Sequence, residues 1–207
     1  KYDIPFYCYQ QCTKHLTYTG PETYREYAWQ VYTALTYGCR GLQTFKYWAY
    51  MVPEVNSNNL GNGLVDPDGN RMPLYYAVQQ VNRDIGSFEE LYMNFSWEGT
   101  MPIGSSGGSA YSLLRYPLES LYGVEPVSAE GDAIIGQFSD NRGNTAYMVT
   151  NYISPYKNES NLVTMKFNEA EKVLICKKGR RIVQKLNNHT LVMQIGPGEG
   201  YFVIPVL

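Results

Sequence analysis

The sequence predicts an α/β segment followed by an all-β segment, in a chain of 207 residues. Before about residue 95, strand-like apolar runs alternate with stretches in which apolar residues recur every three or four positions, the spacing of a helix. From residue 132 onward, short runs rich in Val, Ile, Tyr and Phe are separated by turn residues. Several such strands at regular spacing are typical of an antiparallel sandwich.

The first segment reads as strand, helix, strand, loop and helix. Residues 4–9 are aromatic and β-branched and predict a strand. Residues 21–37 have helical spacing, and Gly38 is expected to end that helix. Residues 42–48 predict a second strand, and a helix opened by a proline is expected over 73–91.

Polar and glycine-rich stretches connect these elements. The loop 49–71 contains the tetrapeptide DPDG at 66–69, which predicts a tight turn. A calcium loop would need further oxygen ligands at fixed offsets, and residues 70–72 do not supply them. SSGGS at 105–109 is a flexible loop or linker.

We therefore expect three parts: residues 1–95, a linker and irregular segment over 96–131, and an antiparallel β-sandwich over 132–207. The last part holds seven apolar runs, namely AIIGQF, TAYMVTNYI, NLVTMKF, EKVLIC, RRIVQKL, TLVMQI and YFVIPVL.

Composition and charge narrow the classes of function that this chain can have. A net charge of −2 and a pI of about 5.7 do not suggest a nucleic-acid or anionic-membrane partner. No apolar run approaches the roughly 20 residues that span a bilayer. Cys8, Cys12 and His15 do not match a zinc pattern, so we predict buried thiols and neither a metal nor a cofactor. The compartment stays open between cytoplasmic and secreted.

The carboxyl end of the second strand carries the strongest functional signal. Lys46, Tyr47, Trp48 and Tyr50 gather there, at the end of a parallel strand where ligands are commonly met. Aromatic rings with hydrogen-bonding groups suit a sugar ring better than a phosphate or a nucleotide. Most of the 20 tyrosines are expected to be half-buried surface residues instead.

The order of these motifs resembles a known family. A helix ending ALTYGCRG, a strand ending FKYW, the turn GLVDPDG, a helix containing PLYYAVQQVN and the closing QIGPGEGYFVIPV follow the first strand. Together they resemble the last two βα units and the C-terminal sandwich of bacterial (β/α)8 glycoside hydrolases related to family 42 β-galactosidases. The resemblance implies a partial TIM barrel, with residues 4–9 and 42–48 as its seventh and eighth strands.

The family's catalytic residues do not carry over. Its general acid follows strand four, which this chain does not contain, and its nucleophilic Glu ends strand seven, where this chain reads Tyr9, Gln10, Gln11 and Cys12. The resemblance implies that the Trp48 ring forms the floor of a sugar subsite and that Glu54 is an acidic residue that binds sugar. The predicted carbohydrate-binding residues are Gln10, Lys46, Trp48, Tyr50 and Glu54.

Other chemistry has weaker support. Asp66 and Asp68 are expected to form a turn rather than a carboxylate pair. His15 and His189 lie in no Ser or Cys motif, and the GPGEG sequence lacks the Lys and Ser/Thr of a P-loop. No catalytic residue is assigned.

Three functional readings remain. The chain is the C-terminal portion of a glycoside hydrolase-like protein, inactive alone, or it is a non-catalytic carbohydrate-binding module, or its sandwich only covers the flank of a barrel. The abrupt opening KYDIPFYCY, without Met, favours a portion of a longer protein. Because two βα units cannot close a barrel, we expect the remainder of that barrel, or self-association, as partner.

Overall fold

The computed structural model describes residues 4–13, 20–48, 63–104 and 117–206. The described chain is mostly β-sheet, with three α-helices and one short 3-10 helix. Its elements are β1 (Tyr7–Gln11), α1 (Tyr24–Thr36), β2 (Gly41–Phe45), α2 (Pro73–Gly86), α3 (Glu89–Met93), β3 (Ser96–Ile103), β4 (Val124–Ala129), β5 (Ala133–Ser139), β6 (Thr145–Asn151), η1 (Pro155–Lys157), β7 (Asn161–Phe167), β8 (Lys172–Lys177), β9 (Arg180–Lys185), β10 (Thr190–Ile195) and β11 (Gly200–Val206).

The first two strands form a parallel pair. Their register runs from Tyr7 opposite Gly41 to Gln11 opposite Phe45, with α1 as the connection. Side chains alternate between two faces of this pair. Tyr7 and Tyr9 lie on the uncovered face and are 67% and 69% exposed, whereas Gln10 on the other face is buried. In the described part of the chain, no third strand joins this sheet.

Helix α1 begins and ends where local chemistry dictates. At its start, the Glu26 carboxylate accepts hydrogen bonds from the backbone N–H groups of Glu22 (2.7 Å) and Thr23 (3.3 Å). These donors have no partner within the helix, so the side chain satisfies them. At its end, Gly38 has φ of +82°, which a residue with a Cβ adopts only with strain. The prediction that Gly38 stops this helix is confirmed.

The helix expected over 73–91 is two helices. α2 ends at Gly86, and α3 begins at Glu89 after Phe88 leaves helical geometry with φ of −138°. This break turns the Phe88 ring into the core, where it stacks on Phe202 at 5.7 Å between ring centroids. Burial of that ring therefore outweighs the continuation of the helix.

Two antiparallel sheets follow the helices and face one another. The larger has strand order β3-β5-β6-β11-β8-β9, and the smaller has order β10-β7-β4. Apolar side chains from both sheets form one cluster between them, as in a sandwich. Fully buried members include Ile135, Val149, Val163, Met165, Val173, Leu191 and Val203.

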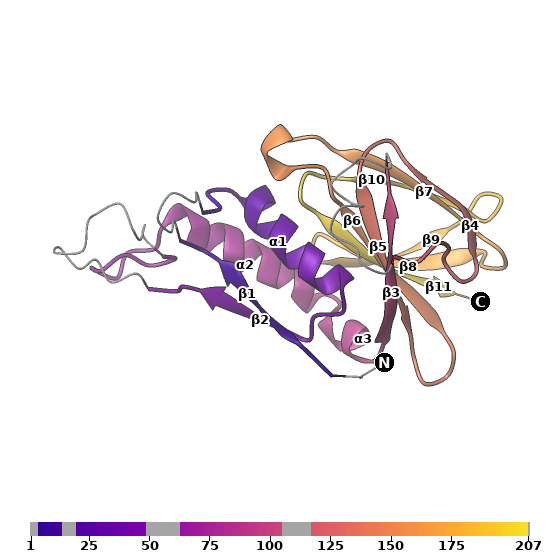
Figure 1. Ribbon diagram of the computed structural model, residues 1–207, viewed down its shortest axis with the longest axis horizontal. Helices are drawn as coiled ribbons and strands as arrows, with labels where there is room; N and C mark the ends of the chain where they lie inside the picture. The colour runs from indigo at the N-terminus through magenta and orange to yellow at the C-terminus, as the bar shows by residue number, and fades with distance from the viewer. Residues whose placement is uncertain (1–3, 14–19, 49–62, 105–116, 207) are drawn as a thin grey trace.

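The other face of the larger sheet is covered by the helices, which Figure 1 shows lying between it and the β1–β2 pair. A second cluster fills this interface, with Phe138, Met148, Cys176 and Phe202 from the sheet, Ala28, Val31, Tyr32, Val81 and Tyr92 from the helices, and Phe88 from the break between α2 and α3. The central strands of the larger sheet are thus buried on both faces. Continuous apolar runs in β5, β6 and β11 reflect this burial, whereas β7 and β10 alternate because one face meets solvent.

Glycines let α1 approach the larger sheet closely. A Cβ added at Gly136 would lie 2.2 Å from the Thr36 carbonyl oxygen, and one at Gly200 would lie 2.7 Å from the Tyr32 ring. The Thr36 hydroxyl also lies 2.7 Å from that of Thr150, inside this buried interface. At Gly136 the backbone of α1 therefore packs directly against the larger sheet, with no room for a side chain on the sheet.

The segment expected to be a linker, 96–131, contains two strands. β3 pairs with β5 at one edge of the larger sheet, and β4 pairs with β7 at one edge of the smaller. Gly99 and Pro102 in β3, and Pro126 in β4, weaken the strand signal in the sequence. Edge positions tolerate these residues because one side of the strand needs no partner.

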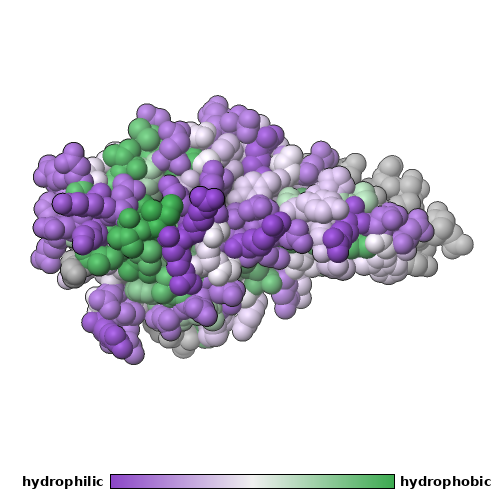
Figure 2. Space-filling view, turned by 180° about the vertical axis from the view of Figure 1, so that it is seen from behind, coloured by the Kyte–Doolittle hydropathy of each residue, from purple (hydrophilic) through white to green (hydrophobic). Residues whose placement is uncertain are grey.

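Figure 2 shows hydrophobic side chains gathered on the rear of the sandwich and framed by hydrophilic ones. Exposed apolar side chains on its strands include Val183 of β9, at 64% exposure, and Val206 of β11, at 42%. None of the described helices is long and apolar enough to cross a membrane.

Replacing Gly136 by alanine tests the close approach of α1. The new Cβ would collide with the backbone oxygen of Thr36, which cannot move without shifting the helix. We expect a loss of about 1–3 kcal/mol in the free energy of unfolding, measured by urea denaturation. Gly86→Ala is the control, because a Cβ there meets nothing within 4 Å. Equal stability of the two variants would contradict the packing described.

Candidate functional site

The carboxyl end of β2 presents aromatic side chains to solvent. Tyr47 is 56% exposed and Trp48 is 46% exposed, immediately after the strand ends at Phe45. The backbone beyond is held in place because Trp48 forms a parallel bridge with Val65, whose N–H donates to the Tyr47 carbonyl at 2.9 Å. Gly63 makes this possible, since a Cβ there would lie 2.4 Å from the Lys46 carbonyl oxygen.

Further rings lie on the open face of the β1–β2 pair and at the start of α2. We call them, together with Tyr47 and Trp48, the aromatic group; its members are Tyr9, Phe45, Tyr47, Trp48, Tyr75 and Tyr76. Three neighbouring ring pairs have centroids 5.6–6.5 Å apart in edge-on arrangements, namely Tyr9–Phe45, Tyr47–Tyr75 and Tyr75–Tyr76. The Arg71 guanidinium lies 4.7 Å from the Tyr75 ring centroid. Such edge-on contacts hold rings in fixed orientations.

The predicted binding residues are only partly together. Lys46 and Trp48 lie at the end of β2, as the sequence indicates. Gln10 is 1% exposed and lies on the opposite, covered face of β1, away from the aromatic group. Among the described residues, none accepts a hydrogen bond from its side-chain nitrogen. Tyr50 and Glu54 lie outside the described residues.

The sequence reasoning missed Tyr9, Tyr75 and Tyr76. A usable signal was present, because Tyr7 and Tyr9 are spaced by two in a strand and so share one face. That face is the open one. The tyrosines of α2 gave no such signal, since helical spacing alone does not tell which side a partner covers.

The carboxylates near the strand end form a turn. Asp66 accepts hydrogen bonds from the backbone N–H of Asp68 (3.0 Å) and from the backbone (2.7 Å) and side chain (3.0 Å) of Asn70. These hydrogen bonds, with that from the Asn70 side chain the largest cause, lower the pKa of Asp66. Asp140 repeats the arrangement with Arg142 and Asn144, and its pKa is lowered likewise. Asp66 is therefore occupied as a turn former, as predicted.

The lowered pKa values of Asp66 and Asp140 predict that the fold loses stability in acid. A carboxylate with a lowered pKa in the folded state stabilises the fold above its unfolded pKa and loses that effect as the pH falls through the folded value. In Asp140→Asn, we expect the free energy of unfolding to depend less on pH than in the wild type, between about pH 5 and about pH 2. Urea denaturation across this range measures it. The control is the corresponding acid-to-amide change at the exposed Glu125, Glu125→Gln. Identical pH profiles for Asp140→Asn and the wild type would refute the prediction.

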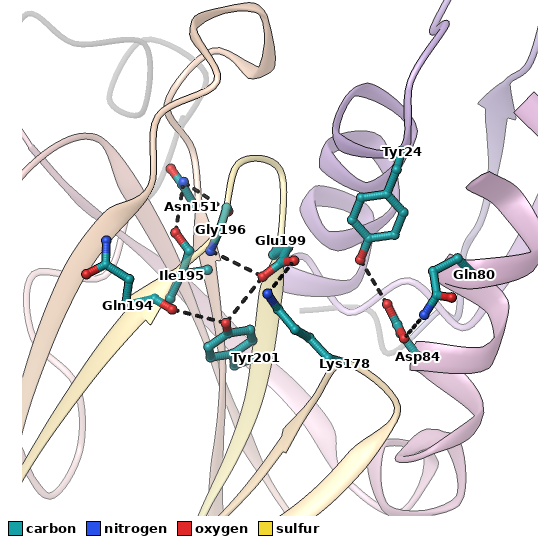
Figure 3. Close-up of polar contacts among 10 residues, drawn as sticks. All are labelled: Tyr24, Gln80, Asp84, Asn151, Lys178, Gln194, Ile195, Gly196, Glu199 and Tyr201. Carbon is teal, nitrogen blue, oxygen red and sulfur yellow. Dashed lines mark hydrogen bonds and ion pairs between the residues drawn. The ribbon is translucent and has the colours of Figure 1, made fainter. Parts of the chain in front are cut away.

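A buried polar cluster lies where the helices meet the sandwich (Figure 3). Asp84 of α2 is 2% exposed and accepts hydrogen bonds from the Tyr24 hydroxyl and the Gln80 side chain, both at 2.8 Å. Burial, together with the nearby Tyr32 and Asp84, raises the pKa of Tyr24, so its hydroxyl stays protonated as a donor. Both partners of this carboxylate come from α1 and α2.

Glu199 is the second buried carboxylate of this region, at 8% exposure. It forms an ion pair with Lys178 at 3.1 Å, and it accepts hydrogen bonds from the Gly196 N–H and the Tyr201 hydroxyl, each at 3.2 Å. The GPGEG sequence thus forms the turn before β11, as predicted, and the hydrogen bond from the Gly196 N–H to the Glu199 side chain closes this turn. Asp84 and Glu199 line neither the cavity of about 520 Å³ beside Tyr122 nor the one of about 510 Å³ beside Arg40.

Both carboxylates are satisfied by neighbouring donors, so the cluster is structural. We expect Tyr24→Phe to lower the free energy of unfolding by about 1–3 kcal/mol, because Asp84 would lose one of its two donors while still buried. Chemical denaturation checks this value, with Tyr156→Phe at a 66% exposed ring as the control. A Tyr24→Phe variant as stable as the control would contradict this assignment.

The cysteines and acidic residues show no further site. All four cysteines are free, and burial raises the pKa of the Cys12 thiol to about 12 and that of Cys176 to about 11. Such thiols are poor nucleophiles and ligands. Within the ranges that the structure describes, no three His, Cys, Asp or Glu side chains are placed to hold a metal ion.

Comparison of the chain with protein-family models, with curated proteins and with solved structures finds no match. We therefore infer function from the geometry of the aromatic group and of the two-stranded sheet that carries it.

Proposed function

We propose that this chain is the C-terminal portion of a glycoside hydrolase-like protein, whose full-length form hydrolyses O-glycosyl bonds. In this proposal β1 and β2 are the last two strands of a (β/α)8 barrel, and the sandwich packs against the outer helices. The chain supplies part of the carbohydrate-binding rim rather than the catalytic pair.

One observation carries the proposal: exposed aromatic rings stand at the carboxyl end of a parallel strand pair whose other face is covered by helices. In a (β/α)8 barrel, helices cover the outside, and ligands bind at the carboxyl ends of the strands. The helix-covered face of β1–β2 corresponds to the outside, and the open face with Tyr7 and Tyr9 corresponds to the interior.

The chain alone is expected to lack turnover. Glycoside hydrolysis uses two carboxyl groups about 5 Å apart for retention or about 6.5–9.5 Å apart for inversion. At the end of β1 the chain has Gln10 and Gln11, and neither amide can serve as nucleophile or base. Asp66 is held in its turn by three hydrogen bonds.

The missing carboxylate also favours an alternative, in which the chain is a non-catalytic carbohydrate-binding or structural accessory module. Sugar binding by the aromatic group is common to both proposals, because stacking requires no carboxylate pair. The two proposals differ only in whether the rest of the full-length protein supplies the catalytic residues.

Binding at the aromatic group is tested with Trp48→Ala. Titration of oligosaccharides, followed by tryptophan fluorescence and calorimetry, should give an affinity that falls at least tenfold in this variant, equivalent to about 1.4 kcal/mol. Tyr156→Ala removes a 66% exposed ring of the sandwich and is the matched control. Unchanged affinity in Trp48→Ala, with the fold intact by circular dichroism, would reject this site.

The open sheet gives a second prediction about the isolated chain. We expect concentration-dependent self-association in sedimentation experiments, because no third strand pairs with β1 or β2 among the described residues and their open face is uncovered. Tyr9→Lys combined with Phe45→Lys should shift the chain toward monomer by charging this face. Val192→Lys, on a 52% exposed position of the sandwich, should not. A monomeric wild type at high concentration would count against the partial barrel.

A further inference from the structure

A cavity of about 520 Å³ opens at one end of the sandwich, on elements far from the aromatic group in sequence. Its walls come from the segment before β4, the β5–β6 turn, the β7–β8 turn and the end of β11. Its volume falls within the roughly 300–1,000 Å³ typical of small-molecule sites. It is lined by neither of the buried carboxylates of the polar cluster.

The floor of the cavity is aromatic and fixed. Tyr147 and Phe167 are 1% and 2% exposed, and their rings meet edge-on with centroids 6.0 Å apart. The Tyr147 hydroxyl donates a hydrogen bond to the Tyr122 carbonyl, so the floor is tied to the wall. A floor of packed rings resists collapse, because both rings belong to the sandwich core.

The wall presents an open ring. Tyr122 is 73% exposed although its backbone is held on both sides, by Tyr147 at its carbonyl and by the Gln137 side chain at its N–H (2.6 Å). A side chain with two χ angles on a fixed backbone loses little entropy when a ligand stacks on it. The space beside it is open, since a Cβ added at Gly123 or Gly143 would meet nothing within 4 Å.

The polar lining selects the charge of the ligand. Asn144, Asn168 and Glu169 supply amide and carboxylate groups, and none of the described lining residues is Lys, Arg or His. The Asn144 side-chain N–H already donates to Asp140, so Asn144 offers the ligand its amide oxygen. Phosphates, nucleotides and other anions would therefore find no counter-charge in the cavity. Hydroxyl groups on a neutral ring suit amides and a carboxylate, and the apolar face of such a ring suits Tyr122.

We propose that this cavity is a second carbohydrate-binding site, for one or two neutral sugar rings, with Tyr122 as the stacking ring and Asn144, Asn168 and Glu169 as hydroxyl partners. It is separate from the aromatic group and does not depend on the proposed barrel. It gives the sandwich a role beyond packing against the helices.

Nuclear magnetic resonance of the labelled chain tests this site with neutral methyl glycosides and disaccharides as probes. We expect saturable amide shift changes at residues 143–145 and 168–170, and at least a tenfold weaker affinity in Tyr122→Ala. That variant should fold, because both polar contacts of Tyr122 use its backbone. Thr145→Trp, which places a large ring in the lining, should also weaken binding.

Two controls separate this site from the aromatic group. Trp48→Ala and Tyr156→Ala should leave the shifts at residues 143–145 and 168–170 unchanged. Absence of these shifts at tens of millimolar saccharide in the wild type would overturn the proposal. Shifts that persist in both Tyr122→Ala and Thr145→Trp, or that disappear only in Trp48→Ala, would overturn it as well, whatever the outcome at the aromatic group.

Discussion

The position of helix α1 between two sheets is the constraint on which the rest of the structure depends. One side of α1 packs on the β1–β2 pair, and the other meets the six-stranded sheet so closely that only glycine fits at Gly136. Because backbone meets backbone there, the helix cannot slide or tilt without a collision. The sandwich therefore fixes the strand pair, and with it the orientation of the aromatic rings at the end of β2.

This arrangement explains why the six-stranded sheet differs from the three-stranded one. Helices cover one of its faces and the smaller sheet covers the other, so its central strands are apolar on both sides. The buried carboxylates Asp84 and Glu199 lie at the border of this interface, where hydrogen-bond donors from helices and turns satisfy them. Each is satisfied within its own part, Asp84 by the helices and Glu199 by the sandwich, because buried charges without partners would destabilise the fold.

Local rules predicted much of the fold. The end of α1 at Gly38, the Asp66 turn and the runs that form β5 to β11 follow from backbone preferences that the sequence displays directly. The strands β3 and β4 were not predicted from the sequence, because Gly99, Pro102 and Pro126 weaken the strand pattern. The break before Phe88 and the covering of the larger sheet depend on contacts distant in sequence, which local patterns do not contain.

For the candidate site, the sequence predicts binding by both Trp48 and Gln10, and the structure places them differently: Trp48 lies at the exposed end of β2, whereas Gln10 is buried on the covered face of β1. Strand alternation decides this, because Gln10 shares the covered face with Cys8, whereas Tyr9 shares the open face with the rings. The cavity beside Tyr122 has no sequence signature, since its walls come from four separate segments. Both proposed surfaces thus arise from the way the sheets and helices stack.

Site-resolved hydrogen exchange of β1 and β2, at concentrations low enough to keep the chain monomeric, tests most directly whether this pair is an unfinished sheet. In a two-stranded sheet only alternate amides point to the partner strand. We predict that the amides directed outward from β1 and β2 exchange fast, except that of Gln11, which donates to the Gln30 side chain. The intervening amides, and those throughout β6 and β11, are expected to be protected. Protection of every amide in β1 and β2 would mean that both edges are already covered, and would contradict the account.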